Sequence, residues 1–182
     1  MMHKYNFKKY YFISEYDTNQ IINQDKSTNI IFRNYNDKLD YKKIIKLRNF
    51  CKKRGNKFFL SNDFKLAINL KLDGVYLPSF NKNFKHLAYN LRKNFLVLGS
   101  AHTLKEIKIK KIQAVNTIFL SSIFKKNKNY LGLNKFKNLS SRTNLNIIAL
   151  GGISNDNIKL LGLVKIFGFA GISYFKKKGP YK

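Results

Sequence analysis

Polar residues and glycines that could bind a phosphorylated ligand directly follow a series of short apolar runs. Arg33 could form a fork of hydrogen bonds to a phosphate, or pair with an acid on a neighbouring strand. Asp63 could ligate a divalent cation, although the pair Asn62-Asp63 also suits the start of a helix. Gly151 and Gly152 could form a turn, or let backbone N–H groups approach an anion. These residue types favour chemistry on an anionic substrate.

Other familiar catalytic patterns are missing from the sequence. Cys51 is the single cysteine, and we find no metal-ligand cluster of histidines and cysteines. A G-x-S-x-G turn, a P-loop and a G-x-G-x-x-G segment are also absent. Readings as a hydrolase, a zinc protein or a dinucleotide-binding enzyme therefore lose most of their support.

The chain is strongly basic, with a formal net charge of +27 from 36 Lys+Arg against 9 Asp+Glu. Such a balance raises the question of nucleic acid or an anionic membrane. The lysines, however, are dispersed along the chain and far outnumber the arginines, as expected of a solvated surface. We expect the charge to concentrate small phosphorylated substrates, and we do not expect nucleic acid or a membrane as the main partner.

The sequence also predicts where the protein works. It has no apolar run of about 18 residues that could span a bilayer, and no signal peptide is recognisable at its start. A lone cysteine fits a reducing compartment. We therefore expect a cytoplasmic protein, and no pattern indicates an oligomeric state.

Eight short apolar runs recur at rather even spacing and predict strands; they are residues 10–14, 29–33, 57–61, 74–78, 95–99, 116–122, 146–152 and 166–173. Most of the segments between them have apolar residues at helical spacing; these are residues 40–55, 62–74, 84–93, 103–112 and 154–163. Thr103 and Glu106 predict a capping box, and Ser154 or Asn155 could cap the last of these helices.

Continuous apolar strands that alternate with helices favour a parallel sheet covered on both faces. Eight such units predict a single (β/α)₈ TIM barrel over residues 1–182, compact, with short loops and a truncated last helix after Ser173. The alternative is an open doubly wound sheet with one or two strands misassigned. The longest non-periodic connection is residues 121–133.

In a barrel, function belongs at the carboxyl ends of the strands. The residues found there, beyond those named first, are Pro78-Ser79, Ser100, His102, Ser121-Ser122 and Gly171-Ile172-Ser173. Ser100 and His102 could instead cap the helix that follows. The glycine pair after the seventh strand and Gly171-Ile172-Ser173 after the eighth stand where barrels commonly bind phosphate.

Several segments in this order resemble the family of thiamine-phosphate synthase and its relative, thiazole tautomerase. The segments are "YYFISE" (10–15), "FFLSNDFKLAINLKLDGVYLP" (58–78), "LGSAHTLKEI" (98–107), "IFLSSIF" (118–124), "IIALGGI" (147–153) and "GFAGIS" (168–173). The synthase joins a hydroxymethylpyrimidine diphosphate to a thiazole phosphate and releases pyrophosphate, with Mg²⁺ and basic residues on the diphosphate.

The resemblance implies a role for each matching residue. By this resemblance, Arg33 would bind the diphosphate and Asn62 the pyrimidine diphosphate. Asp63 would ligate Mg²⁺, and Ser100 would contact the pyrimidine. The thiazole phosphate would be held by backbone N–H groups of the glycine pair, chiefly Gly152, and of Ile172 and Ser173. We add His102 as a candidate substrate-binding residue.

This sequence departs from the family pattern in the diphosphate half. Of the segment Q-x-R-x-K only Arg33 remains, the second magnesium carboxylate falls on Asn81, and the histidine of D-G-V-H-L is Tyr76. In the loop 125–129, "KKNKN", Lys126 or Lys128 could supply the missing charge. We select Arg33, Ser100 and Lys128 as the catalytic candidates.

Three hypotheses follow. The first is a thiamine-phosphate synthase-like transferase that uses Mg²⁺. The second is a tautomerase-like relative that binds a thiazole phosphate without coupling and would take its general acid/base from His102 or Tyr76. The third is a non-enzymatic protein that binds an anion or RNA.

Overall fold

A computed structural model of the chain describes residues 7–35 and 39–176. The strands are β1 (Lys8–Ile13), β2 (Thr28–Phe32), β3 (Phe58–Ser61), β4 (Gly74–Leu77), β5 (Leu96–Ala101), β6 (Thr117–Ser121), β7 (Asn146–Leu150) and β8 (Gly168–Gly171). The helices are α1 (Asn19–Ile22), α2 (Tyr41–Arg54), α3 (Phe64–Asn69), α4 (Leu104–Ile112), α5 (Gly132–Ser140) and α6 (Ser173–Lys176), with 3₁₀ helices η1 (Lys85–Ala88) and η2 (Ile158–Leu163).

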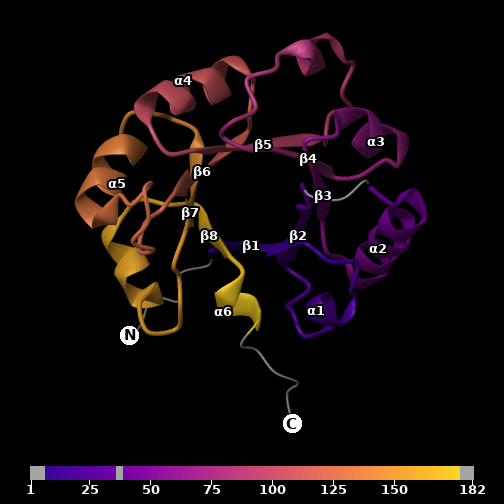
Figure 1. Cartoon of the computed structure of the whole chain (residues 1–182), viewed down its shortest axis with the longest axis horizontal. Coiled ribbons are helices and arrows are strands. Elements are labelled where there is room, and N and C mark those ends of the chain that lie inside the picture. The colour runs from indigo at the N-terminus through magenta and orange to yellow at the C-terminus, as the bar shows by residue number, and fades with distance from the viewer. Residues whose placement is uncertain (1–6, 36–38, 177–182) are drawn as a thin grey trace.

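The strands form a closed parallel barrel in chain order, with β1 paired to both β2 and β8. Figure 1 shows the ring of strands with the helices arranged around its outside. The predicted (β/α)₈ barrel is thereby confirmed, and the alternative of an open doubly wound sheet is wrong.

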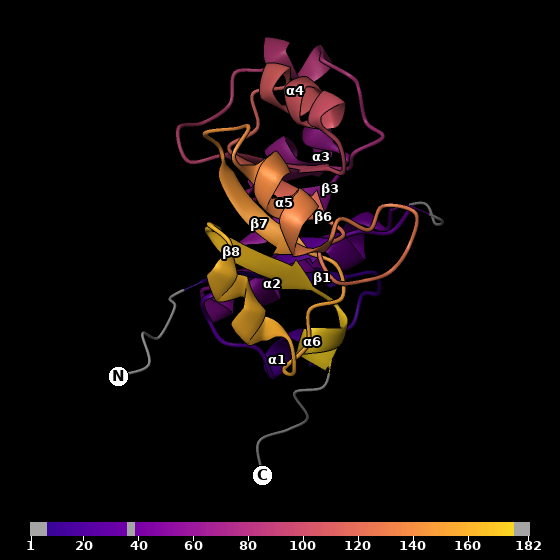
Figure 2. The same ribbon diagram turned by 90° about the vertical axis from the view of Figure 1, so that its left-hand side faces the viewer.

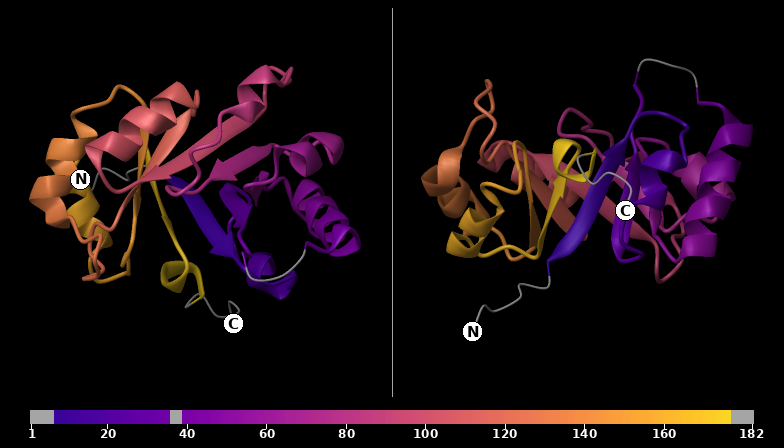
Figure 3. Two further views of the ribbon diagram at one scale, coloured as in Figure 1. Left: turned by 45° about the horizontal axis from the view of Figure 1, so that its top comes forward. Right: turned by 90° about the horizontal axis from the view of Figure 1, so that it is seen from below.

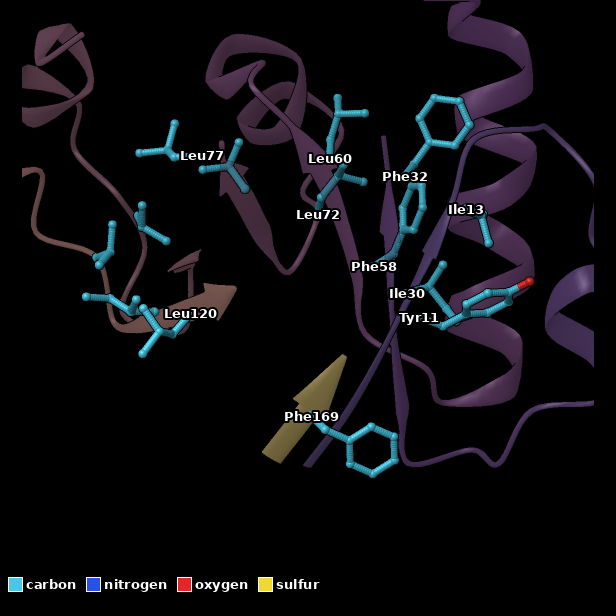
Figure 4. Close-up of a cluster of buried hydrophobic side chains, with 14 of the residues drawn as sticks. Tyr11, Ile13, Ile30, Phe32, Phe58, Leu60, Leu72, Leu77, Leu120 and Phe169 are labelled. Atoms are coloured by element: carbon cyan, nitrogen blue, oxygen red, sulfur yellow. The ribbon is translucent and has the colours of Figure 1, made fainter. Parts of the chain in front are cut away.

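Two layers of buried side chains hold the barrel together. The inner layer fills the barrel and is rich in aromatic rings; it consists of Tyr10, Phe12, Ile31, Phe59, Tyr76, Leu98, Phe119, Ile148 and Ala170. The outer layer lies between the strands and the helices, and Figure 4 shows part of it, including Tyr11, Ile30 and Phe32. Successive residues of a strand point to opposite faces of the sheet. Because the runs are continuously apolar, both faces of the barrel wall are apolar, as the sequence predicts.

Helix α2 illustrates how the sequence sets an element. Ile44, Leu47 and Cys51 recur at helical spacing and are buried against the barrel. The carboxylate of Asp40 accepts a hydrogen bond at the start of the helix, and Gly55 ends it at φ 80°, in the left-handed region that glycine tolerates. The predicted helix at 40–55 is therefore confirmed, with its boundaries.

Two predicted helices are shorter than expected and of the 3₁₀ type. Residues 84–93 form only η1. Residues 154–163 form only η2, and neither Ser154 nor Asn155 caps it, so that prediction is wrong. Instead, the side chain of Asn157 accepts a hydrogen bond from Ser154 N and donates one to Gly152 O. This local bonding competes with a regular first turn.

Other differences lie at the ends of elements. Of the helix predicted over 62–74, only Phe64–Asn69 is helical, as α3. The helix α5 was not predicted, because no capping side chain marks its start after the loop. Of the last helix, predicted after Ser173, the structure describes Ser173–Lys176, and residues 177–182 lie outside the described residues. Across 7–35 and 39–176, no helix combines the length and the apolar character needed to cross a bilayer.

Candidate active site

At the carboxyl end of the barrel, the guanidinium of an arginine packs on an aromatic ring of the inner layer. Phe12 belongs to the inner layer and packs against Tyr76 and Phe119, with ring centroids 5.1 and 5.9 Å away. The guanidinium carbon of Arg33 lies 4.6 Å from the centre of the Phe12 ring. Since Ile31 faces the barrel interior, Arg33, two residues further along, faces the same way. A cation therefore stands on the axis side of the strands, at the end where barrels bind substrates.

Hydroxyl groups surround this arginine. Ser61 and Ser100 follow the inward-facing Phe59 and Leu98 by two residues, and both are buried. The Ser61 hydroxyl donates a hydrogen bond to the Tyr35 hydroxyl at 3.1 Å. Ser100 and Arg33 interact with the Tyr76 hydroxyl. Arg33, Tyr35, Ser61, Tyr76 and Ser100 thus form one group, which we call the mouth cluster.

The tyrosines of the mouth cluster are neutral hydrogen-bonding groups. Burial raises the pKa of Tyr76 to about 12, against the opposing effects of Ser100 and Arg33. Burial also raises the pKa of Tyr35. A phenol that stays protonated at neutral pH can donate a hydrogen bond but does not serve as a general base.

Asn62 and Asp63 lie at the end of β3, beside the mouth cluster. The backbone N–H of Asn62 donates to Tyr76 O, and its φ of 69° is left-handed. One carboxylate oxygen of Asp63 accepts from Leu66 N at 2.9 Å, so Asp63 is the N-cap of α3. The helix-capping reading of Asp63 is correct, which leaves its second oxygen for a ligand.

These residues offer little to a magnesium ion by themselves. In the part of the chain that the structure describes, no three His, Cys, Asp or Glu side chains gather where they could hold a metal. Beside Asp63, the amides of Asn62 and Asn81 are bonded to each other. Mg²⁺ commonly takes one or two carboxylates together with waters and substrate phosphates. The single carboxylate oxygen that Asp63 leaves open is therefore compatible with a magnesium ion only if other ligands come from a substrate and water.

The glycine pair after β7 packs tightly against the loop after β6. A Cβ on Gly151 would lie 2.4 Å from Ser122 Oγ, and one on Gly152 would lie 2.5 Å from Lys125 N. Both glycines have positive φ, 104° and 76°. Gly151 O also accepts hydrogen bonds from Phe124 N and Lys125 N. Close packing of two loops is thus one reason for these glycines.

The same turn leaves backbone donors free. Leu150 pairs with Ala170, so the turn at Gly151-Gly152 and the segment Ile172-Ser173 follow neighbouring strands at the same end of the barrel. Within residues 7–35 and 39–176, the N–H groups of Gly152, Ile172 and Ser173 donate no hydrogen bond. Adjacent free N–H groups are suited to an anion.

Neither His102 nor Lys128 forms a hydrogen bond with the mouth cluster in the part of the chain that the structure describes. His102 Nδ1 is 2.8 Å from Ser121 O, and the ring borders a cavity of about 510 Å³ between α4 and α5. Thr103, not His102, caps α4 by accepting from Glu106 N. The Glu106 carboxylate accepts from His102 N and not from Thr103 N, so only half of the predicted capping box is present. Lys128 is exposed on the loop between β6 and α5, which projects from the same end of the barrel as the segment after β2 in Figures 2 and 3.

Sequence reasoning brought Arg33, Ser100 and Asn62 to the right end of the barrel but missed Tyr35 and Ser61. The alternation of β3 after Phe59 could have identified Ser61 as inward-facing. Tyr35 stands where the family segment Q-x-R-x-K has its lysine, and no local pattern predicts that its hydroxyl bonds Ser61.

Comparison with known proteins gives this site a family. The family described as "Thiamine monophosphate synthase" matches residues 16–175. A protein of Aquifex aeolicus (strain VF5), whose name assigns it provisionally to the thiamine-phosphate synthases, is 33% identical over 141 residues, 74% of each chain. The thiamine-phosphate synthase of Helicobacter pylori (strain J99) is 28% identical over 170 residues, 86% of this chain and 77% of that protein.

Solved structures agree on the fold. Thiamine phosphate pyrophosphorylase from Pyrococcus furiosus superposes with a TM-score of 0.75 at 20% identity, over 91% of this chain and 86% of that one. FabK from Thermotoga maritima reaches 0.70 at 10% identity, over 93% and 59%. Such distant likeness shows a shared barrel and nothing of the chemistry. The family assignment comes from the sequence match along most of the chain, and on that ground this protein is a member of the thiamine monophosphate synthase family.

Proposed function

We propose that this protein is a thiamine-phosphate synthase: a transferase that joins a hydroxymethylpyrimidine diphosphate to a thiazole phosphate and releases pyrophosphate. The observation that carries the proposal is Arg33, which stands on the Phe12 ring beside Ser100 and Tyr76 in a barrel of this family. An arginine held in this way supplies a fixed, forked cation where a diphosphate would lie.

The proposed reaction depends on stabilisation of the leaving group more than on a general base. The thiazole nitrogen forms a bond to the methylene carbon of the pyrimidine, the bond from that carbon to the diphosphate oxygen breaks, and pyrophosphate leaves with the electron pair. Negative charge therefore grows on the diphosphate in the transition state. Arg33 would stabilise that charge, and Ser100 and the neutral Tyr76 would orient the pyrimidine by hydrogen bonds.

Magnesium would add to this stabilisation by neutralising charge on the leaving pyrophosphate. Asp63 is the residue that would hold it, with the oxygen that does not cap α3. Lys126 and Lys128 on the loop after β6 would supply further positive charge, and both are exposed.

The thiazole phosphate would bind at the ends of β7 and β8. The free N–H groups of Gly152, Ile172 and Ser173 follow these two neighbouring strands. A phosphate accepts such hydrogen bonds readily, because three of its oxygens are exposed and charged. This would set the thiazole on the opposite side of the barrel mouth from Asn62, which follows β3.

A tautomerase-like role has less support. It needs a side chain that exchanges protons, whereas the pKa of Tyr76 is raised to about 12 and His102 lies between β5 and β6, outside the mouth cluster. No observation favours RNA over a small phosphorylated ligand.

The proposal is tested with purified protein, Mg²⁺ and both precursors. We expect thiamine phosphate and pyrophosphate to form in equal amounts. An Arg142→Gln variant, changed on the exposed surface at the end of α5, is the control for loss of charge alone. Binding of the thiazole phosphate without any pyrophosphate release would contradict the proposal.

A further inference from the structure

A fully buried lysine lies behind the end of β4. Lys110 on α4 has no exposed surface, although lysine is among the residues least often buried. Its stem passes over Gly99 of β5, where a Cβ would come within 2.9 Å of Lys110 Cδ. Its ammonium donates to two oxygens, Asn81 O and Gln113 Oε1, each at 2.8 Å. The layer between α4 and β5 therefore contains a buried cation whose acceptors are neutral, which calls for an explanation beyond packing.

Gln113 completes the attachment of the loop after β4. Its amide group donates to Asn83 O at 2.8 Å and to Asn81 O at 3.2 Å. The His86 ring bonds Gln113 O at 2.9 Å. Lys110 and Gln113 thus fix the backbone from Asn81 to Asn83 from beneath.

This attachment determines which way the Asn81 amide points. Its oxygen accepts from Asn83 N at 2.8 Å and faces Gln113 Nε2 at 3.4 Å. Its NH₂ group must then point the other way, where it donates to Asn62 Oδ1. An amide has its acceptor on one arm and its donors on the other, so the orientation of Asn81 also sets that of Asn62.

Asn62 is left with a free donor. Its oxygen is taken by Asn81, and its NH₂ has no hydrogen-bond partner in the part of the chain that the structure describes. Asn62 lines a cavity of about 190 Å³ together with Lys65 and Lys85. Asp63 adds one negative charge to the same cavity, so positive charge predominates. An oxygen of a diphosphate is the ligand that such a donor and two lysines suit.

We propose that Lys110 is a positioning residue: through the Asn81 carbonyl it holds the Asn62–Asn81 amide pair so that Asn62 presents its NH₂ to a diphosphate oxygen directly, without a metal. The inference rests on the proposed function for the identity of the diphosphate.

The experiment measures the affinity for inorganic pyrophosphate by calorimetry, with chelator present so that no metal contributes. We expect Lys110→Met to weaken binding by about tenfold, the effect of one well-placed hydrogen bond to a charged group. Lys111→Met, at the exposed neighbouring position on α4, should leave the affinity unchanged. Asn62→Ala should weaken binding by a similar factor.

The double variant Lys110→Met/Asn62→Ala distinguishes an effect of Lys110 through Asn62 from a general destabilisation of the site. If Lys110 acts through Asn62, Lys110→Met should change the affinity by less than about twofold in the Asn62→Ala background. Equal effects in both backgrounds, or no effect in either, would overturn the inference. So would a wild-type chain that binds no metal-free pyrophosphate, while the transferase itself is judged separately by pyrophosphate release with Mg²⁺.

A second variant tests the same orientation without touching the buried lysine, in case Lys110→Met does not fold. Asn81→Asp removes the donor to Asn62 Oδ1, so the Asn62 amide should turn and donate to the new carboxylate. Metal-free pyrophosphate should then bind about tenfold more weakly. Unchanged binding by this variant would also overturn the inference.

Discussion

A Cβ on Gly152 would lie 2.5 Å from the backbone nitrogen of Lys125, so the turn after β7 and the loop after β6 fit together only if residue 152 lacks a side chain. Its φ of 76° adds a second reason. We expect Gly152→Ala to lower the free energy of unfolding by about 3 kcal/mol, of which about 1 comes from φ and about 2 from the clash. Chemical denaturation measures this loss.

Gly55 provides a matched control for the free-energy cost of placing a residue with a Cβ at positive φ. Its φ is 80°, and a Cβ there would meet nothing within 4 Å. Gly55→Ala should therefore cost only about 1 kcal/mol. Equal losses for the two variants would mean that the contact with Lys125 does not constrain residue 152.

The barrel could be predicted because its signals are local, whereas the site depends on contacts between distant segments. An apolar run predicts a strand without any knowledge of the segments that pack against it. Because side chains alternate along a strand, the inward orientation of Ile31 and Phe59 also predicts that Arg33 and Ser61 point inward. Lys110 gave no such signal, because a lysine on a lysine-rich helix is expected in solvent. Only the fold shows that its stem crosses Gly99.

The role proposed for Arg33 predicts a large kinetic effect with little change in stability. Arg33→Gln should lower kcat/KM for coupling by about 100-fold, because the variant loses a forked cation aimed at the leaving group. Arg33→Lys should recover only part of the loss, since an ammonium cannot form the fork. Steady-state kinetics with pyrophosphate detection measures both, and full activity in Arg33→Gln would exclude the role.

The two functions of Asp63 can be separated by one substitution. Asn caps helices about as well as Asp, so Asp63→Asn should keep the free energy of unfolding within about 0.5 kcal/mol, while Asp63→Ala loses about 1. If Asp63 also holds Mg²⁺, Asp63→Asn should raise the Mg²⁺ concentration for half-maximal coupling about tenfold.

Asp40→Asn is the control for capping alone, because Asp40 caps α2 in the same way. It should leave both stability and the Mg²⁺ requirement unchanged. An unchanged Mg²⁺ requirement in Asp63→Asn as well would assign Asp63 to the helix only.

Tyr76 should contribute a hydrogen bond and no proton transfer. Burial raises its pKa to about 12, so the hydroxyl remains protonated up to pH 10. Tyr76→Phe should lower coupling by less than about tenfold and leave the pH profile between 6 and 10 unchanged in shape. A loss of the alkaline limb in the variant would show instead that the phenol titrates during turnover.

The stability conferred by Lys110 should depend on pH, with a sign that follows from its burial. Removal from water lowers its pKa from 10.5 to about 8, with Glu106 as the opposing charge nearby. Between pH 8 and 10.5 the unfolded chain carries a proton at this position that the folded chain has released, so folding becomes more favourable as the pH rises.

We therefore expect wild type to gain stability relative to Lys110→Met across that window, by up to about 3 kcal/mol, since one pKa unit corresponds to about 1.4 kcal/mol. Below pH 8 the difference between the two proteins should be constant. Tyrosines and the other lysines are common to both proteins and cancel in the comparison. Denaturation series at pH 7, 8, 9 and 10 measure the difference, and a flat or falling trend would show that the ammonium keeps its proton in the folded protein because Asn81 O and Gln113 Oε1 stabilise it fully.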